Sequence, residues 1–100
     1  MLKVVSLLKR AENMSHDEFS TWVLTDHKPF AEKLPGLRRY VVNVGTDPEG
    51  EFDSVNELWF DDEAARAAAF GSEHGKAAAG DAAAHTSRRV HILTQEHPQL

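Results

Sequence analysis

Residues 37–60, LRRYVVNVGTDPEGEFDSVNELWF, predict a β-hairpin in the middle of the chain. The first arm, from Leu37 to Val44, alternates charged and apolar residues and then becomes apolar, which is typical of a strand. Residues 45–50, GTDPEG, are turn formers throughout, and residues 54–60 alternate again as the second arm. Side chains of the second arm therefore point to two sides of a sheet: Val55, Glu57 and Trp59 to one, and Asn56, Leu58 and Phe60 to the other.

A helical region is predicted before the hairpin. Residues 15–18, SHDE, form a capping-box pattern, in which the Ser15 hydroxyl accepts from the Glu18 amide and the Glu18 side chain reaches back. Pro29 lacks an amide hydrogen and its ring crowds the preceding turn, so we expect the helix to bend or restart near His27. Residues 35 and 36, Pro-Gly, end the region. Its apolar stripe comprises Phe19, Trp22, Val23, His27, Phe30 and Leu34.

The segments on either side complete the pattern. Residues 2–8 are nearly all apolar, which indicates a strand that is buried on both faces at the centre of the sheet. After the hairpin, Asp61 is expected to cap an alanine-rich helical region, with Asp62 and Glu63 in its first turn. A Gly-Ser pair at 71–72 divides this region, and Ser72 is expected to cap the second piece. Residues 89–96 form the last predicted strand.

The order of elements is β-α-β-β-α-β, which predicts an α+β, ferredoxin-like fold formed by residues 1–100 as one domain. In that fold both helical regions cover one face of an antiparallel sheet. We expect the other face to carry Trp59 and Tyr40, and an uncovered apolar face marks an interface. A homodimer is therefore expected, in which two sheets meet as a dimeric α+β barrel with a lumen. The predicted helix–sheet core includes Phe19, Trp22, Leu58 and Phe60.

Composition excludes several classes of function. The chain has 100 residues, a net charge of −5 and no cysteine. Because Lys and Arg form no cluster, neither nucleic acid nor an anionic membrane is an expected partner. The absence of cysteine excludes disulfides, thiolate zinc sites and iron–sulfur clusters. No apolar run is long enough to cross a membrane and the start lacks a signal-peptide pattern, so we expect a cytoplasmic protein.

Motifs for metals and cofactors are also missing from the sequence. It contains no G-x-G-x-x-G, no P-loop, no G-x-S-x-G and no H-E-x-x-H. The histidines at positions 16, 27, 74, 85, 91 and 97 include no pair three or four residues apart, the spacing of a helical metal site. We therefore expect no metal and no cofactor, although a flavin or haem site needs no motif.

Two polar residues in apolar surroundings are candidates for chemistry. His27 sits in the apolar stripe beside the expected bend, and histidine titrates near neutral pH, which suits proton transfer. The alternative is a buried histidine that bonds to a carbonyl freed near Pro29. Glu57 lies in the middle of a strand on a mostly apolar face. Its carboxylate is either a general base with a raised pKa or a salt-bridge partner of Arg39 or Arg89.

Two aromatic residues are candidates for lining a ligand pocket. Tyr40 offers a hydroxyl as a donor or acid, and Trp59 offers a flat apolar wall. Aromatic residues more often pack at a sheet or dimer interface. Packing is the simpler interpretation for Trp59, and both interpretations stay open for Tyr40.

Several short motifs recur along nearly the whole chain in a characteristic order. They are residues 3–10 (KVVSLLKR), 14–19 (MSHDEF), Trp22, 27–29 (HKP), 34–40 (LPGLRRY), 57–61 (ELWFD) and 94–97 (TQEH). Together they resemble the EthD family of dimeric α+β barrel proteins. The segments at 27–29, 34–40 and 57–60 look like that family's H-x-P, P-G-L-x-x-Y and E-x-W-F elements.

The resemblance implies a dimeric barrel with a lumen cleft in each subunit. The family is named for a protein associated with ether degradation, and relatives of similar fold include muconolactone-type isomerases, polyketide cyclases and cofactor-poor monooxygenases. Matching by motif, the expected catalytic residues are His27, Tyr40 and Glu57. The expected ligand-binding residues are Trp59, Trp22 and His85, the last at a position where relatives vary.

Two functions fit these residues. In the first, an isomerase, cyclase or cofactor-poor oxidoreductase takes a small apolar ring compound, such as a lactone or phenol, into the cleft, and His27 moves a proton. Tyr40 or Glu57 would hold the oxygen, and Trp59 would form a wall. In the second, the protein binds a hydrophobic metabolite or assists a partner enzyme without catalysis. A closed apolar cleft with converging polar groups favours the first, and an open polar cleft with His27 bonded to backbone favours the second.

Overall fold

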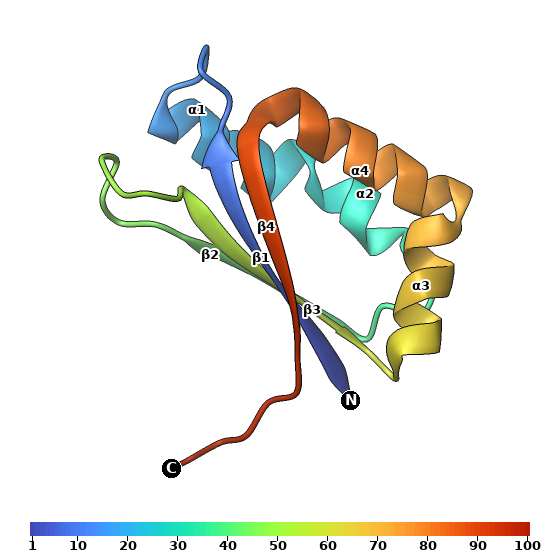
Figure 1. Cartoon of the computed structure of the whole chain (residues 1–100). Helices are drawn as coiled ribbons and strands as arrows, with labels where there is room; N and C mark the ends of the chain where they lie inside the picture. Colours follow the sequence, from blue (N-terminus) through green and yellow to red (C-terminus); the bar gives the residue numbers. More distant parts are fainter.

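The computed structural model describes residues 1–100 and shows a four-stranded antiparallel sheet with helices on one face (Figure 1). The strands lie in the order β2-β3-β1-β4, so β1 is central, as its apolar sequence predicts. This is the ferredoxin-like α+β fold that the order of elements predicts. The elements are β1 (Leu2–Arg10), α1 (His16–Thr21), the π-helical segment η1 (Trp22–Asp26), α2 (Lys28–Glu32), β2 (Arg39–Val44), β3 (Ser54–Phe60), α3 (Glu63–Gly71), α4 (Glu73–His85) and β4 (Thr86–Thr94).

The first helical region breaks where Pro29 predicts. Its capping box forms, with the Glu18 amide donating to Ser15 Oγ at 3.0 Å and the Ser15 amide donating to Glu18 Oε1 at 2.9 Å. The π-helical segment then widens the helix, so that the His27 amide donates to the Trp22 carbonyl, five residues back, at 2.9 Å. α2 restarts directly after His27 with the proline in its first turn, where the missing amide hydrogen leaves no bond unmade.

The second helical region begins one residue later than predicted. Asp62, not Asp61, caps α3 by accepting from the Ala65 amide at 2.8 Å. Asp61 is engaged elsewhere, because it forms a two-point ion pair with Arg38 at 2.9 and 3.1 Å. The division at residues 71–72 is confirmed, and Ser72 caps α4 as predicted.

Strand ends also shift relative to the prediction. β2 begins at Arg39 rather than at residue 37, and β1 continues to Arg10. β4 spans Thr86–Thr94 rather than residues 89–96, because it pairs with the whole length of this longer β1. Beyond β4 the chain leaves the sheet as an extended tail (Figure 1). No helix is both long enough and apolar enough to pass through a membrane.

The core lies between the sheet and the helices. The predicted core residues are all buried there: Phe19, Trp22, Leu58 and Phe60. Tyr40 lies directly opposite Leu58 in the β2–β3 register, so its side chain also faces the helices. The expectation that Tyr40 shares a face with Trp59 is therefore wrong. The hairpin residues alternate as predicted. Which set of alternating β2 residues faces the helices is decided by the register of β2 with β3.

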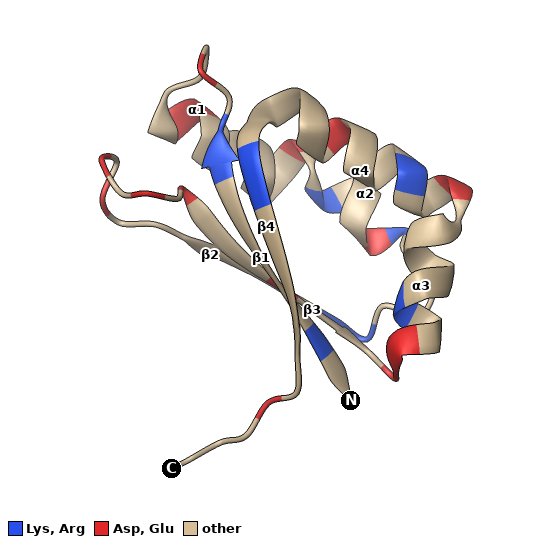
Figure 2. Ribbon diagram, viewed as in Figure 1, with Lys and Arg blue, Asp and Glu red and all other residues tan.

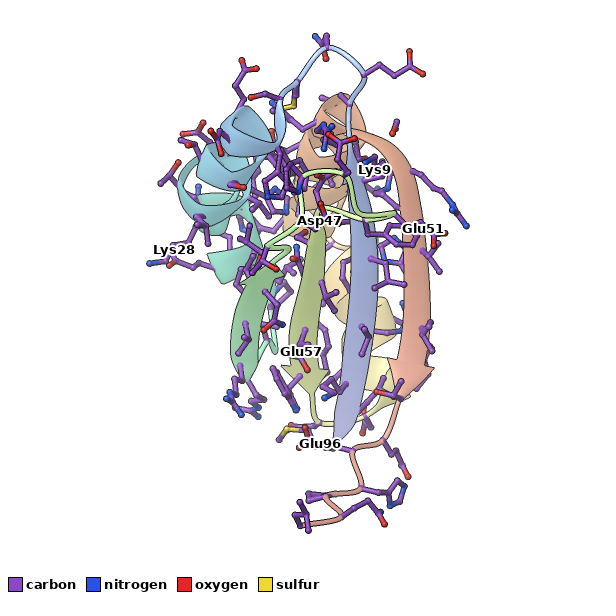
Figure 3. All side chains as sticks on the ribbon, turned by 90° about the vertical axis from the view of Figure 1, so that its left-hand side faces the viewer. Lys9, Lys28, Asp47, Glu51, Glu57 and Glu96 are labelled. Carbon is purple, nitrogen blue, oxygen red and sulfur yellow. The ribbon has the colours of Figure 1, made fainter.

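The opposite face of the sheet carries no helix, and it is turned toward the viewer in Figure 3. Trp59 lies on it between the cationic groups of Lys3 and Arg39, which are 5.2 and 4.6 Å from its ring. The Lys and Arg positions of the strands lie toward the strand ends (Figure 2). We call this surface the open face; its apolar members are Val5, Leu7, Val41, Val55, Trp59, Val90 and Ile92.

Candidate active site

A cavity of about 270 Å³ lies between the sheet and the helices. Eleven of the 17 lining residues are hydrophobic, so the cavity offers a largely apolar surface to a small ligand. It is open at the edge strand β4, where Arg89, His91 and Leu93 are exposed. Its lining comprises Val4, Ser6, Leu8, His27, Ala31, Leu34, Tyr40, Asn56, Leu58, Arg66, Phe70, Ala78, Ala79, Ala82, Arg89, His91 and Leu93.

His27 lines the cavity, and one of its ring nitrogens donates a hydrogen bond to a carboxylate. Its side chain is buried, and Nδ1 lies 2.8 Å from Oδ2 of Asp81 on α4. The same oxygen accepts a hydrogen bond from Trp22 Nε1 at 3.1 Å. Because a carboxylate only accepts, Nδ1 carries the proton, and in the neutral ring Nε2 is the free basic nitrogen. No protein atom bonds to that nitrogen.

Local sequence explains how this pair is assembled. The π-helical segment ends at His27 and shifts its side chain relative to a regular α-helix, and single-turn π segments are frequent at functional sites. Around Asp81, α4 is built mostly of alanine, which favours the helix, with Gly80 beside it, and these residues keep the side chains near the histidine small. The pairing of Asp81 with His27 is therefore a product of two helices that are distant in sequence.

His85 and Trp22 support this pair from behind rather than lining the cavity. The two rings stack with centroids 4.5 Å apart and an interplanar angle of 16°. His85 Nδ1 lies 2.7 Å from the carbonyl oxygen of Asp81, one helical turn earlier, and so donates to it. The Trp22 ring is also 4.7 Å from that of His27. Neither Trp22 nor His85 is among the cavity-lining residues.

Tyr40 lies on the sheet side of the same cavity. Its hydroxyl is buried and has no hydrogen-bond partner in the protein. Burial raises the pKa of Tyr40 to about 12, so the hydroxyl keeps its proton at neutral pH. A buried, unpaired hydroxyl of this kind is available to donate to an oxygen of a ligand.

Glu57 and Trp59 lie on the open face, away from this cavity. Glu57 accepts from Lys3 Nζ at 2.9 Å and from Asn43 Nδ2 at 3.0 Å (Figure 3). These hydrogen bonds hold the pKa of Glu57 below its usual range, against the weaker opposing effect of burial. Of the two interpretations of Glu57, general base or salt-bridge partner, the structure supports the salt bridge. Its partner is Lys3 rather than Arg39 or Arg89. The structure brings His27 and Tyr40 to one cavity and does not bring Glu57 or Trp59 to it.

Comparison with known proteins identifies the family and agrees with the fold described above. Residues 11–88 match the EthD domain. The chain belongs to the EthD family. The crystal structure of an EthD family protein from Bacillus halodurans C-125 superimposes on it with a TM-score of 0.83, at 25% identity over 97% of this chain and 99% of that one. No curated protein sequence matches significantly.

Two structures of lower sequence identity share the fold of the present chain. One is a dimeric ferredoxin-like protein of unknown function from Thermobifida fusca, with a TM-score of 0.75 at 18% identity over 93% of this chain and 88% of that one. The other is SnoaB, a cofactor-independent oxygenase from Streptomyces nogalater, with a TM-score of 0.74 at 18% identity over 99% of this chain and 95% of that one.

Several residues at the site were not singled out from the sequence. Asp81 is the principal one: it holds His27 from behind the cavity lining, and its only sequence signal is a carboxylate within the alanine-rich part of α4. Asn56, Ser6 and His91 are the others, and all three face the helices from the sheet. No group of three or more His, Asp or Glu side chains lies close enough together to hold a metal ion.

Proposed function

We propose that this EthD protein binds a small, largely apolar ring compound in the cavity and that His27 moves a proton on it. The observation that carries the proposal is the 2.8 Å hydrogen bond between Asp81 and His27 Nδ1, which leaves Nε2 as the basic nitrogen on a cavity wall. A carboxylate that holds a histidine in this way fixes its tautomer and stabilises the cation formed when the ring takes up a proton. Apolar surroundings strengthen that interaction.

The remaining groups suit proton transfer next to an oxygen. Tyr40 is a neutral donor that can polarise a carbonyl or stabilise an enolate, while His27 accepts the proton from the neighbouring carbon or hydroxyl. Returning the proton to a different atom gives isomerisation or cyclisation. A deprotonated, electron-rich ring is also the species that can react with oxygen without a cofactor, and SnoaB, of the same fold, is a cofactor-independent oxygenase.

A protein that only binds a metabolite is the second candidate. It needs the cavity but not a histidine poised by a carboxylate. The apolar lining and the carboxylate partner of His27 favour the enzyme over this candidate. Glu57 has no place in the proposed chemistry, since it lies on the open face and is paired with Lys3.

The test begins by identifying a retained ligand through native mass spectrometry of protein purified from its own host. That ligand is then incubated with the protein in D₂O, and incorporation of deuterium is followed by NMR. We expect wild type and the open-face control Glu57→Gln to exchange a ligand proton, and His27→Gln to be slower by at least about 100-fold. Exchange by His27→Gln at the wild-type rate would leave only the binding function.

We also propose that the chain forms a homodimer through the open face. The face carries seven apolar side chains and has no helix over it (Figure 3). The Thermobifida fusca structure of the same fold is of a dimeric protein. A chain of this size gains stability from burying such a surface.

A further inference from the structure

One row of the sheet floor of the cavity is polar on three neighbouring strands. Asn56 on β3 lies directly opposite Ser6 on β1, and Ser6 lies directly opposite His91 on β4. All three side chains line the cavity. The next row of the floor is apolar on the same three strands, with Val4 opposite both Leu58 and Leu93, and Tyr40 on β2 completes it. A ligand lying in the cavity therefore meets hydrogen-bonding groups on the sheet along this row.

Asn56 is the member of this row whose side-chain oxygen has no hydrogen-bond partner. Ser6 Oγ and His91 Nδ1 are 2.8 Å apart and satisfy one another. Asn56 is only 4% exposed, yet its Oδ1 has no donor within hydrogen-bonding distance. Leaving a buried carbonyl oxygen unpaired destabilises the fold, so the position is unfavourable unless something else supplies the donor. Asn56 lines the cavity, so a ligand that seats against its amide group is the partner that can supply the donor.

Charge decides what kind of donor fits. The cavity lining contains two cationic side chains, Arg66 and Arg89, and no acidic one. Arg66 is neutralised by Glu63 at 2.6 Å, whereas Arg89 makes its side-chain hydrogen bond to the Thr86 hydroxyl and has no carboxylate partner. A cationic amine would be repelled from such a cavity. A neutral or weakly acidic hydroxyl is favoured, because it can donate to an amide oxygen beside positive charge.

His91 is consistent with a hydroxyl ligand. His91 is exposed at the edge strand, but partial desolvation of its ring, with a smaller contribution from the charge of Arg89, lowers the pKa of His91, so its ring is neutral at neutral pH. A neutral ring with Nδ1 unprotonated accepts the Ser6 proton, which leaves the Ser6 oxygen free to accept from a second hydroxyl. Ser6 and Asn56 then both act as acceptors, side by side in the row.

We propose that the ligand of this cavity carries a phenol- or enol-type hydroxyl that donates to Asn56 Oδ1, next to Ser6 on the sheet floor. This inference rests on the proposed function and narrows its substrate class to hydroxylated rings. Asn56 is a specificity-determining residue in this role, on the opposite wall from His27. The ring of the ligand packs against the apolar residues of the helices, and its hydroxyl faces the sheet.

The test uses a matched pair of probes, 2-naphthol and its methyl ether 2-methoxynaphthalene, with binding measured by isothermal titration calorimetry. We expect wild type to prefer the naphthol by about tenfold, the effect of one hydrogen bond to a buried acceptor. Asn56→Leu should bind the ether as well as wild type does and lose the preference. It should also unfold at higher denaturant concentration, since an unpaired buried oxygen has been removed.

Ser54→Ala is the matched control. Ser54 is on the same strand and face and also has a buried, unpaired oxygen, but it does not line the cavity. It should keep the preference for the naphthol. Equal binding of both probes to wild type, or a preference that survives in Asn56→Leu, would overturn the hydroxyl assignment while leaving the apolar cavity intact. Failure of wild type to bind either probe would overturn the cavity as a ligand site and with it the proposed function.

Discussion

Asp81 determines what His27 can do, because one of its oxygens holds both the histidine and Trp22. The sequence marked His27 as unusual, since it interrupts an apolar stripe. It could not supply the partner, which lies 54 residues further on and is brought close only by the packing of α4. The same is true of Glu57, whose mid-strand position is legible in the sequence while its bond to Lys3 depends on the pairing of β1 with β3.

At this scale we predict that Asp81→Asn impairs proton transfer without abolishing it. The amide oxygen can still accept from His27, but it carries no charge to stabilise the protonated ring, and the amide NH₂ can donate to Nδ1 instead. Deuterium exchange into the ligand should fall by roughly 10- to 100-fold, less than in His27→Gln. Imidazole ¹⁵N shifts of the neutral His27 ring should show the Nδ1–H tautomer in wild type and a mixture of the Nδ1–H and Nε2–H tautomers in the variant. Glu73→Gln, an exposed change on the same helix, is the control, and an unchanged tautomer in Asp81→Asn would contradict the positioning role.

The elements themselves follow from local patterns, and most were predictable. Ser54–Phe60 has the predicted bounds, and the capping box and the break before Pro29 are confirmed. The face of Tyr40 was not predictable, because alternation fixes which residues of β2 share a side but not which side meets the helices. That choice is made by the register in which Tyr40 pairs with Leu58.

Asp53 joins several elements at one end of the sheet. It is buried, and it accepts from the Arg10 amide at 2.8 Å, from Arg10 Nη1 at 2.6 Å and from His16 Nδ1 at 2.7 Å. Burial alone would raise its pKa, but these hydrogen bonds outweigh burial and hold the pKa of Asp53 below its ordinary value. A lowered folded-state pKa stabilises the fold above the unfolded pKa of about 4, and the stabilisation is lost as the pH falls through the folded value.

We therefore predict that Asp53→Asn lowers the free energy of unfolding by about 3 kcal/mol at pH 7, since it leaves buried donors without their charged acceptor. The difference from wild type should shrink as the pH is lowered from about 4 to 2, where the wild-type carboxyl also takes up a proton. Urea denaturation across this range measures it. Glu51→Gln, which breaks a surface ion pair with Arg88, should change stability by less than about 0.5 kcal/mol. A gap that stays constant with pH would show that Asp53 is not the titrating group.

For the whole molecule, the open face is the feature that a single subunit leaves unexplained. A stable interface buries about 800 Å² on each partner, which a four-stranded sheet face can provide. Lys3, Glu57 and Asn43 satisfy one another there, so the polar groups among the apolar ones would enter an interface already paired. Trp59 is only 8% exposed in the single subunit, because Lys3 and Arg39 lie over its ring, so the contact area must come mainly from the valine, leucine and isoleucine side chains of the open face.

We predict that wild type has twice the chain mass by light scattering at micromolar concentration and that Ile92→Asp is a folded monomer. Ile92 lies on the open face and is 48% exposed in the single subunit, so a charge there costs the subunit little but would be buried unpaired in a dimer. Leu93→Asp is the matched control. Leu93 is next to Ile92 on the same strand and is 47% exposed, but it faces the helix side, so the variant should remain dimeric. A monomeric wild type, or a Leu93→Asp protein that dissociates while Ile92→Asp does not, would place the contact elsewhere. His27→Gln should stay dimeric, because His27 lies in the cavity on the other side of the sheet from the proposed interface.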